Sequence, residues 1–152
     1  MRIHKVKTAA ALGAVALLAA AMGGTASAAP SAGYRTTGQP TGAVLVDCVW
    51  HTQVRPADFL LACGDGNNSL SSLRWSHWDP GSATATGINV VNDCKPYCAA
   101  GKFHSYPVIV RLDRAQPWTK HPQLKQFTQL SLVYTGARPE GSNRVVSYPL
   151  WD

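Results

Sequence analysis

The chain has 152 residues, which is long enough for one domain with a buried core and too short for several. Its 14 Lys and Arg residues outnumber its 8 Asp and Glu residues, but three of the cations lie in the first seven positions, and the sequence after residue 28 carries a net charge of only +3. That charge is ordinary for solubility and is not gathered into a dense basic stripe, so we expect no nucleic-acid partner.

The N-terminus has the three parts of a secretory signal peptide in order. A basic stretch, 1–7, precedes an apolar run, 8–22, and Ala26 and Ala28 supply the small side chains of a cleavage site. The apolar run of 15 residues is shorter than the ~20 that a membrane-spanning helix needs, so a membrane anchor is the weaker interpretation. We therefore predict a secreted protein with residues 1–28 as its signal peptide and no membrane attachment after cleavage.

Residues 29–41 are small and polar and have little to bury, which predicts a flexible arm. Residues 42–152 are predicted to form a single domain, because short apolar or alternating runs are separated by Gly, Pro, Asn and Asp. Seven candidate strands follow in chain order, at 43–50, 58–63, 70–75, 84–91, 106–112, 127–135 and 144–148. Residues 118–126 have room for one helical turn. The pattern predicts an all-β fold, a small antiparallel β-sandwich or barrel of about seven strands with two disulfides.

All four cysteines lie after the signal peptide, and an even number of cysteines in an exported chain indicates disulfides. Three pairings are possible, and proximity in the sequence favours Cys48–Cys63 and Cys94–Cys98. A metal site built from Cys94, Cys98 and His104 is the alternative, but an oxidising environment favours disulfides over thiolate ligands. We expect no bound metal and no cofactor.

Residues 94–104 are the segment with the most distinctive chemistry. The sequence Cys-Lys-Pro-Tyr-Cys-Ala-Ala-Gly-Lys-Phe-His joins two candidate strands and contains the shorter predicted disulfide. A local disulfide limits the shapes of a loop and so lowers the ordering cost of binding. The candidate binding residues are therefore Lys95, Tyr97, Lys102 and Phe103, with Trp78 as a further aromatic candidate. The alternative is a tied-down connection that resists proteolysis.

The densest aromatic cluster is Trp75-Ser76-His77-Trp78. Because side chains alternate between the two faces of a strand, Trp75 and Trp78 are expected on opposite faces. Such side chains either stack on a flat ligand such as a sugar or fill the core of a small β domain, and core packing is the commoner role.

The residues that catalysis would need are present but form no recognisable motif. Four histidines follow the signal peptide, namely His51, His77, His104 and His121. The sequence contains neither a Gly-x-Ser-x-Gly elbow nor a His-Glu-x-x-His helix motif. Asp65, Asn67 and Ser69 have the oxygen spacing that opens a calcium loop. Leu70 and Ser76 stand where that loop needs a glycine and an acid, so a hairpin turn is the better interpretation.

The placement of cysteine and tryptophan in the domain is distinctive. It is carried by residues 59–70, by Leu73-x-Trp75-x-x-Trp78, by Asn92-Asp93-Cys94-Lys95-Pro96-Tyr97-Cys98-Ala99-Ala100-Gly101 and by Tyr106-Pro107-Val108. These segments resemble a group of small exported proteins of actinobacteria, over roughly residues 45–150. The resemblance implies export, a two-disulfide domain and a bacterial source; it implies no activity and carries over no functional residue.

A weaker similarity involves residues 94–97 and 106–110, which are similar to the reactive-loop region of secreted subtilisin-inhibitor-type proteins. Those proteins are also small, exported, β-rich and held by two disulfides. Their second disulfide is long-range, whereas Cys94 and Cys98 are four positions apart. The similarity therefore adds only an analogy in favour of protease inhibition.

We expect a secreted, non-enzymatic interaction module that acts as a monomer and binds an extracellular protein or small ligand through residues 94–104 and nearby aromatics. Protease inhibition is one form that such binding would take. The alternative from another class is a small secreted hydrolase with a histidine in its site. A cleft that joins a histidine to a serine, an aspartate or a metal would favour the hydrolase, and a protruding stapled loop without a cleft would favour the binding module.

Overall fold

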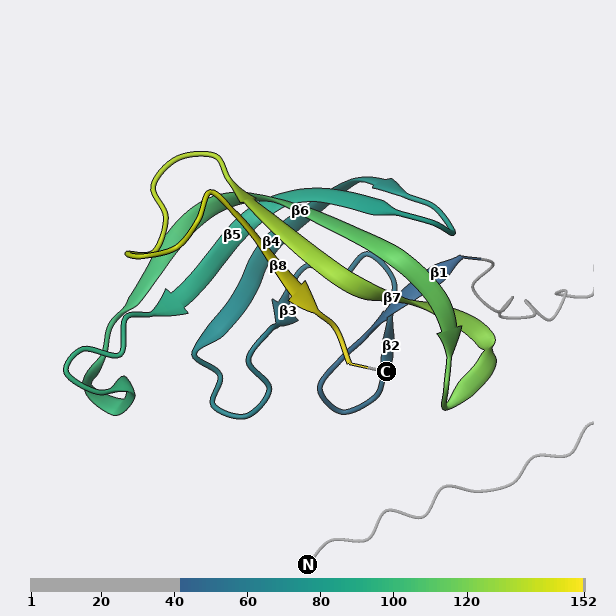
Figure 1. Cartoon of the computed structure of the whole chain (residues 1–152), viewed down its shortest axis with the longest axis horizontal. Coiled ribbons are helices and arrows are strands. Elements are labelled where there is room, and N and C mark those ends of the chain that lie inside the picture. The colour runs from purple at the N-terminus through teal and green to yellow at the C-terminus, as the bar shows by residue number, and fades with distance from the viewer. Residues whose placement is uncertain (1–41, 152) are drawn as a thin grey trace, which may run out of the picture. The chain divides into compact units, whose positions relative to one another are not determined.

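The computed structural model describes residues 42–151; the predicted signal peptide, 1–28, and arm, 29–41, lie outside these residues, as does position 152. The described chain is built almost entirely of strands (Figure 1), so the predicted all-β fold is confirmed. The strands are β1 (Ala43–Val46), β2 (Thr52–Gln53), β3 (Phe59–Leu60), β4 (Asn68–Trp78), β5 (Ala83–Asn92), β6 (Phe103–Trp118), β7 (His121–Tyr134) and β8 (Val145–Pro149). One short 3-10 helix, η1 (Cys98–Ala100), lies between β5 and β6. Over residues 42–151, no helix is both long and apolar enough to cross a bilayer.

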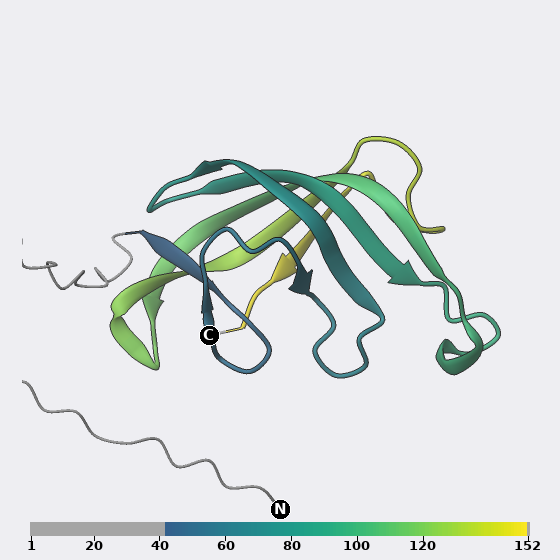
Figure 2. The same cartoon turned by 180° about the vertical axis from the view of Figure 1, so that it is seen from behind.

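The strands form one mixed sheet in the order β2-β1-β7-β6-β5-β4-β3, with β8 also paired to β7. Neighbouring strands are antiparallel except β1 and β7, which run parallel where Ala43 and Val44 lie beside Lys125 and Gln126. The long strands β4 to β7 arch over the molecule, and the segments that carry β2 and β3 lie on the concave side of the arch (Figures 1 and 2). The sheet is thus a curled half-barrel, with one parallel pair among its antiparallel pairs.

Alternation of side chains along the strands places the core on one face of the sheet. On β6, the buried Val108, Val110 and Leu112 alternate with the more exposed Ile109 and Arg111. The other members of the main core cluster are Ala43, Leu45, Phe59, Leu70, Leu73, Ala83, Ala85, Phe127, Leu130, Leu132, Tyr134 and Leu150. Because these residues come from strands on both sides of β6, this strand joins the two halves of the sheet.

The two tryptophans of β4 both pack against the core, so the expectation that they lie on opposite faces is wrong. The pairing of β4 with β5 is irregular between Trp75 and His77, and such a bulge changes the alternation of side chains. The rings of Trp75 and Trp78 meet edge to face at 4.6 Å. Their indole N–H groups donate hydrogen bonds to the backbone oxygens of Pro56 (2.8 Å) and Ala43 (3.0 Å), respectively.

A buried polar cluster crosses the sheet from β4 to β7. The side-chain amide of Asn89 donates hydrogen bonds to Oδ1 of Asn68 (2.6 Å) and to the backbone oxygen of Ser69 (3.0 Å). The hydroxyl of Tyr134 donates to Oδ1 of Asn89 at 2.8 Å. Burial disfavours the charged phenolate and raises the pKa of Tyr134 to about 12. The polar groups are therefore paired rather than left unsatisfied in the core, which would be costly.

Several elements differ from those predicted: the strand expected at 43–50 ends at Val46, and the one expected at 106–112 extends over Phe103–Trp118. Residues 118–126 form no helical turn; they are the end of β6 and the beginning of β7, held by pairs such as Gln116 with Gln126. Gln126 also pairs with β1 on its other side, so contacts distant in the sequence determine this conformation. The strand Thr52–Gln53 was not predicted, because two residues are too few to show an alternating pattern.

Both predicted disulfides, Cys48–Cys63 and Cys94–Cys98, are present, and none of the described cysteines is free. Cys94 and Cys98 are therefore bonded to each other rather than available as a pair of thiolate ligands. The predicted hairpin turn also forms, since β3 and β4 pair on either side of it, and the carboxylate of Asp65 accepts a hydrogen bond from the backbone N–H of Asn67 at 3.0 Å.

Candidate functional site

The four predicted binding residues of 94–104 belong to one segment, here called the stapled loop (residues 94–104), which connects β5 to β6 and includes the first two residues of β6. The side chains of Tyr97 and Phe103 are 64% and 57% exposed, and Lys95 and Lys102 are exposed as well. Large aromatic side chains are usually covered in a folded protein. An exposed pair on one loop is therefore a candidate contact surface.

The base of the stapled loop is held by the buried side chain of Asn92. Its amide nitrogen donates hydrogen bonds to Oδ1 of Asn67 (2.9 Å) and to the backbone oxygen of Cys98 (2.8 Å), while its Oδ1 accepts from the backbone N–H of Cys94 (3.0 Å). Gly101 packs directly on this group, since a Cβ atom there would clash with Oδ1 of Asn92. One amide thus joins both half-cystines of the loop to Asn67, in the turn directly before β4.

Asp93 makes a second set of bonds across the same loop. Its Oδ1 accepts hydrogen bonds from the backbone N–H groups of Lys102 (2.9 Å) and Lys95 (3.1 Å), and its Oδ2 lies 2.9 Å from Nε2 of His104. The bond from Lys102, followed by those from His104 and Lys95, lowers the pKa of Asp93 to about 2. The carboxylate therefore stays charged over a wide pH range and keeps the loop closed.

A groove of about 650 Å³ opens beside the stapled loop. Its lining includes Asp93, Lys95, His104, Tyr106, Pro139 and Glu140. Lys95 forms an ion pair with Glu140, which lies in the connection between β7 and β8. Both side chains are exposed, so solvent screens the pair and it adds little stability. Its consequence is geometric, because it brings a distant segment to one wall of the groove.

Trp78, the remaining predicted binding residue, is not brought together with the stapled loop. It pairs with Ala83 at the beginning of β5, whereas the loop follows Asn92 at the end of that strand. A strand of this length spans roughly 30 Å at ~3.3 Å per residue. The Trp78 ring is also only partly exposed and meets Phe127 edge to face at 5.5 Å, which is a core contact.

Two histidine–aspartate pairs bear on the hydrolase alternative. Asp79 and Ser82 both approach the same ring nitrogen of His77, Nε2, at 2.7 and 3.3 Å. A nucleophilic triad needs the aspartate and the serine on opposite ring nitrogens, so this cluster has the wrong geometry. The pair of His104 with Asp93 does lie in the groove, but none of the described residues that line it is a serine, a threonine or a free cysteine.

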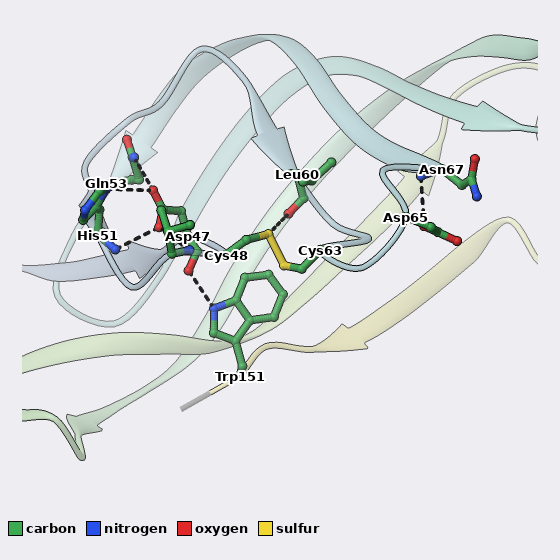
Figure 3. The surroundings of a disulfide bond; sticks show 10 residues. Asp47, Cys48, His51, Gln53, Leu60, Cys63, Asp65, Asn67 and Trp151 are labelled. Atoms are coloured by element: carbon green, nitrogen blue, oxygen red, sulfur yellow. Dashed lines mark hydrogen bonds and ion pairs between the residues drawn. A yellow bond between two sulfur atoms is a disulfide. The ribbon is translucent and has the colours of Figure 1, made fainter.

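A second rigid turn lies at the other disulfide (Figure 3). The carboxylate of Asp47 accepts hydrogen bonds from the backbone N–H groups of Val49 (2.9 Å) and His51 (2.8 Å). Trp151 lies beside the disulfide and donates its indole N–H to the backbone oxygen of Asp47 at 3.2 Å. Between these contacts the turn leaves Val49 and Trp50 64% and 42% exposed.

Asn92, Asp93 and Glu140 hold or line the candidate site but are not among the predicted binding residues. An Asn-Asp pair directly before a cysteine ring is a local signal for side chains that bond to nearby backbone N–H groups. The approach of Glu140 to Lys95 has no such signal, because it depends on the order of strands in the sheet.

No family model matches this chain, and neither a curated protein nor a solved structure matches it. The similarities to exported actinobacterial proteins and to subtilisin-inhibitor-type proteins therefore remain expectations. Within residues 42–151, no three side chains of His, Cys, Asp or Glu cluster in a way that would hold a metal ion.

Proposed function

We propose that this protein is a secreted binding module whose stapled loop contacts an extracellular protein. The observation that supports this most directly is the exposure of Tyr97 and Phe103 on a loop whose base is fixed by Asn92 and Asp93. Aromatic and cationic side chains held outside a fold are typical of binding hot spots. A loop that is ordered before binding also loses little conformational entropy on association.

The chemistry of the loop favours a partner surface with an apolar centre and acidic groups around it. Tyr97 and Phe103 supply the apolar contacts. Lys102 is exposed and makes no salt bridge with any other residue of 42–151, so its charge is free for a partner carboxylate. The active-site cleft of a secreted protease is one surface of this kind, and inhibition of subtilisin is the narrower form of the proposal.

The test compares the wild-type protein with the double variant Tyr97→Ala/Phe103→Ala. Immobilised wild-type protein captures its partner from the culture supernatant of the producing organism, and the purified partner is then titrated against each variant. We expect the dissociation constant to rise by about thirty- to a thousandfold, because each of the two hot-spot truncations costs roughly 1–2 kcal/mol. The thermal midpoint should stay nearly constant, as for other exposed positions.

Val54→Ala is the matched control, since Val54 is similarly exposed (51%) and lies beside Trp78 and Pro80 rather than in the stapled loop. It should leave the dissociation constant unchanged. Equal weakening by both changes would mean that capture depends on exposed apolar surface in general. Strong destabilisation of the double variant would mean that the loop is packed structure, and either result would overturn the proposal. The same variants added to a subtilisin assay test the inhibitor form.

The His104–Asp93 pair supports one alternative, a small secreted hydrolase in the groove. Asp93 bonds to Nε2 of His104, which leaves Nδ1 to take a proton from a water molecule. On this alternative, His104→Gln should abolish hydrolysis of casein or of a p-nitrophenyl ester. His77→Gln is the matched change in a pair outside the groove and should have no effect. Partner capture by a wild-type protein that hydrolyses neither substrate favours the binding module.

A further inference from the structure

Trp50 is held in a backbone conformation that tryptophan rarely adopts. Its φ angle is 68°, in the left-handed region where the Cβ atom of an L residue is crowded. The turn maintains it: the backbone N–H of Asp47 donates to the oxygen of His51 (2.9 Å), and that of Trp50 donates to the oxygen of Asp47 (3.1 Å). The adjacent Cys48 is tied to Cys63. Local strain that the surroundings enforce is a reason to look for function at the strained residue.

The ring of Trp50 contributes to the walls of two hollows. The larger, of about 370 Å³, is lined by Trp50, His51, Thr52, Trp118, His121 and Leu124. The smaller, of about 240 Å³, is lined by Trp50, Trp151 and the two half-cystines of the longer disulfide. The larger hollow falls within the ~300–1,000 Å³ of small-molecule sites. Its aromatic walls are accompanied by histidine and threonine side chains, which can donate or accept hydrogen bonds to a ligand.

One cation, Lys120, lies beside the Trp50 wall of this hollow. Nζ of Lys120 lies 4.3 Å from the centroid of the Trp50 ring, and the ring of His121 lies 4.5 Å from that of Trp118. The oxygens of the one acid in the turn, Asp47, are engaged by Val49, His51 and Gln53. A negatively charged ligand is therefore attracted by Lys120 and meets no uncommitted carboxylate of the turn.

The electron-rich face of an indole ring attracts groups that carry positive partial charge. The ammonium of Lys120 is one such group, and the C–H groups on the flat face of a pyranose ring are another. Trp118, which also lines the hollow, packs its ring against that of His121. A sugar that also carries a carboxylate matches the aromatic face, the polar rim and the cation together.

We propose that the larger hollow beside Trp50 binds a hexuronate unit of an acidic polysaccharide. The C–H face of the sugar lies on the Trp50 ring, its hydroxyls bond to His51, Thr52 and His121, and its carboxylate lies beside Lys120. This site is separate from the stapled loop, since the loop leads into the beginning of β6 at Phe103, whereas Trp118 and Lys120 lie at and beyond its end. The proposal is therefore independent of the proposed function.

The test is an NMR titration of the exported protein with the trimer of galacturonic acid, with its methyl ester and with adenosine monophosphate. We expect saturable shifts at residues 50–52 and 118–121 with the trimer and binding several-fold weaker to the ester. Trp50→Asn removes the ring while keeping a residue that tolerates positive φ, and it should weaken binding by about tenfold or more. Lys120→Gln should weaken binding of the acid but not of the ester.

Lys125→Gln, in β7 a few residues after Lys120, is the matched control and should bind the trimer as the wild type does. No saturable shift with the trimer, equal affinity for acid and ester, or tighter binding of adenosine monophosphate would each overturn the proposal. The two proposals fail separately: Tyr97→Ala/Phe103→Ala should leave the trimer titration unchanged, and Trp50→Asn should leave partner capture unchanged.

Discussion

At the scale of single residues, five residues other than glycine within 42–151 have a positive backbone φ, namely Trp50, Arg55, Ser72, Cys94 and Arg114. Trp50 and Cys94 belong to the two turns that carry the proposed binding surfaces. Arg114 differs from them, because it interrupts β6 between Asp113 and Ala115, and its side chain is exposed. Arg114 belongs to neither proposed binding site, so we expect that the backbone strain there can be relieved without loss of binding.

Arg114→Gly is expected to stabilise the protein by about 0.5–1 kcal/mol. Glycine adopts positive φ without the steric cost that a Cβ atom brings, which outweighs its greater freedom in the unfolded chain. Arg111→Gly is the matched control on the same strand, where the backbone is regular and paired on both sides. It should destabilise by about 0.5–1 kcal/mol. Urea unfolding measures both, and a loss of stability in Arg114→Gly would contradict the argument.

Tyr134 should make stability depend on alkaline pH. Its pKa is raised to about 12 by burial, whereas an unfolded tyrosine titrates near pH 10. The stabilisation is fully present below about pH 10 and is lost as the pH rises toward 12. Tyr134→Phe should lower stability at neutral pH, because Asn89 loses a donor, and should flatten the decline above pH 10. Tyr97→Phe, at an exposed ring, should change neither. Urea midpoints across pH 7–12 provide the measurement.

At the scale of the element, the carboxylate of Asp93 should make the stapled loop sensitive to acid. Its pKa is lowered to about 2, so the stabilisation it gives the loop is present above the unfolded value of about 4 and is lost as the pH falls toward 2. Amide hydrogen exchange at Lys95 and Lys102, corrected for its intrinsic pH dependence, should accelerate over that range. Asp93→Asn should remove the acid dependence. Asp113→Asn is the matched control, because this carboxylate has no hydrogen bond or ion pair within residues 42–151, and the variant should keep the acid dependence of the wild type.

The sequence predicted the bounds of some strands more closely than those of others. The interval 84–91 is within one residue of Ala83–Asn92 at each end. The interval 70–75 was too short, because Asn68 and Ser69 look like turn residues but pair with Val91 and Val90. The stapled loop was located from its cysteines and its aromatic and cationic residues. The groove was not predicted, because Glu140 forms part of its wall, and the position of Glu140 depends on contacts between distant segments.

At the scale of the whole molecule, the half-barrel depends on a segment that is not part of its long strands. Residues 47–66 lie on the concave side of the arch (Figures 1 and 2), where Phe59 joins the core and stacks on Trp151 at 6.0 Å. On the side of β7 away from β6, the parallel pairing of Ala43 with Lys125 adds β1 to the sheet. This pairing joins residues about eighty positions apart, so no local pattern in the sequence predicts it.

Loss of the Cys48–Cys63 disulfide should therefore loosen the concave side of the whole domain. The bond closes a segment with a sequence separation of 15, so Cys48→Ala/Cys63→Ala is expected to cost about 2–4 kcal/mol through the greater freedom of the unfolded chain. Near-ultraviolet dichroism should weaken as well, because Phe59 of this segment stacks on Trp151. Cys94→Ala/Cys98→Ala is the matched control: its sequence separation is only 4, so it should cost less and leave the aromatic signal of the core intact. Urea unfolding without reductant measures both losses, and a larger loss from the shorter ring would show that the stapled loop, rather than residues 47–66, holds the half-barrel together.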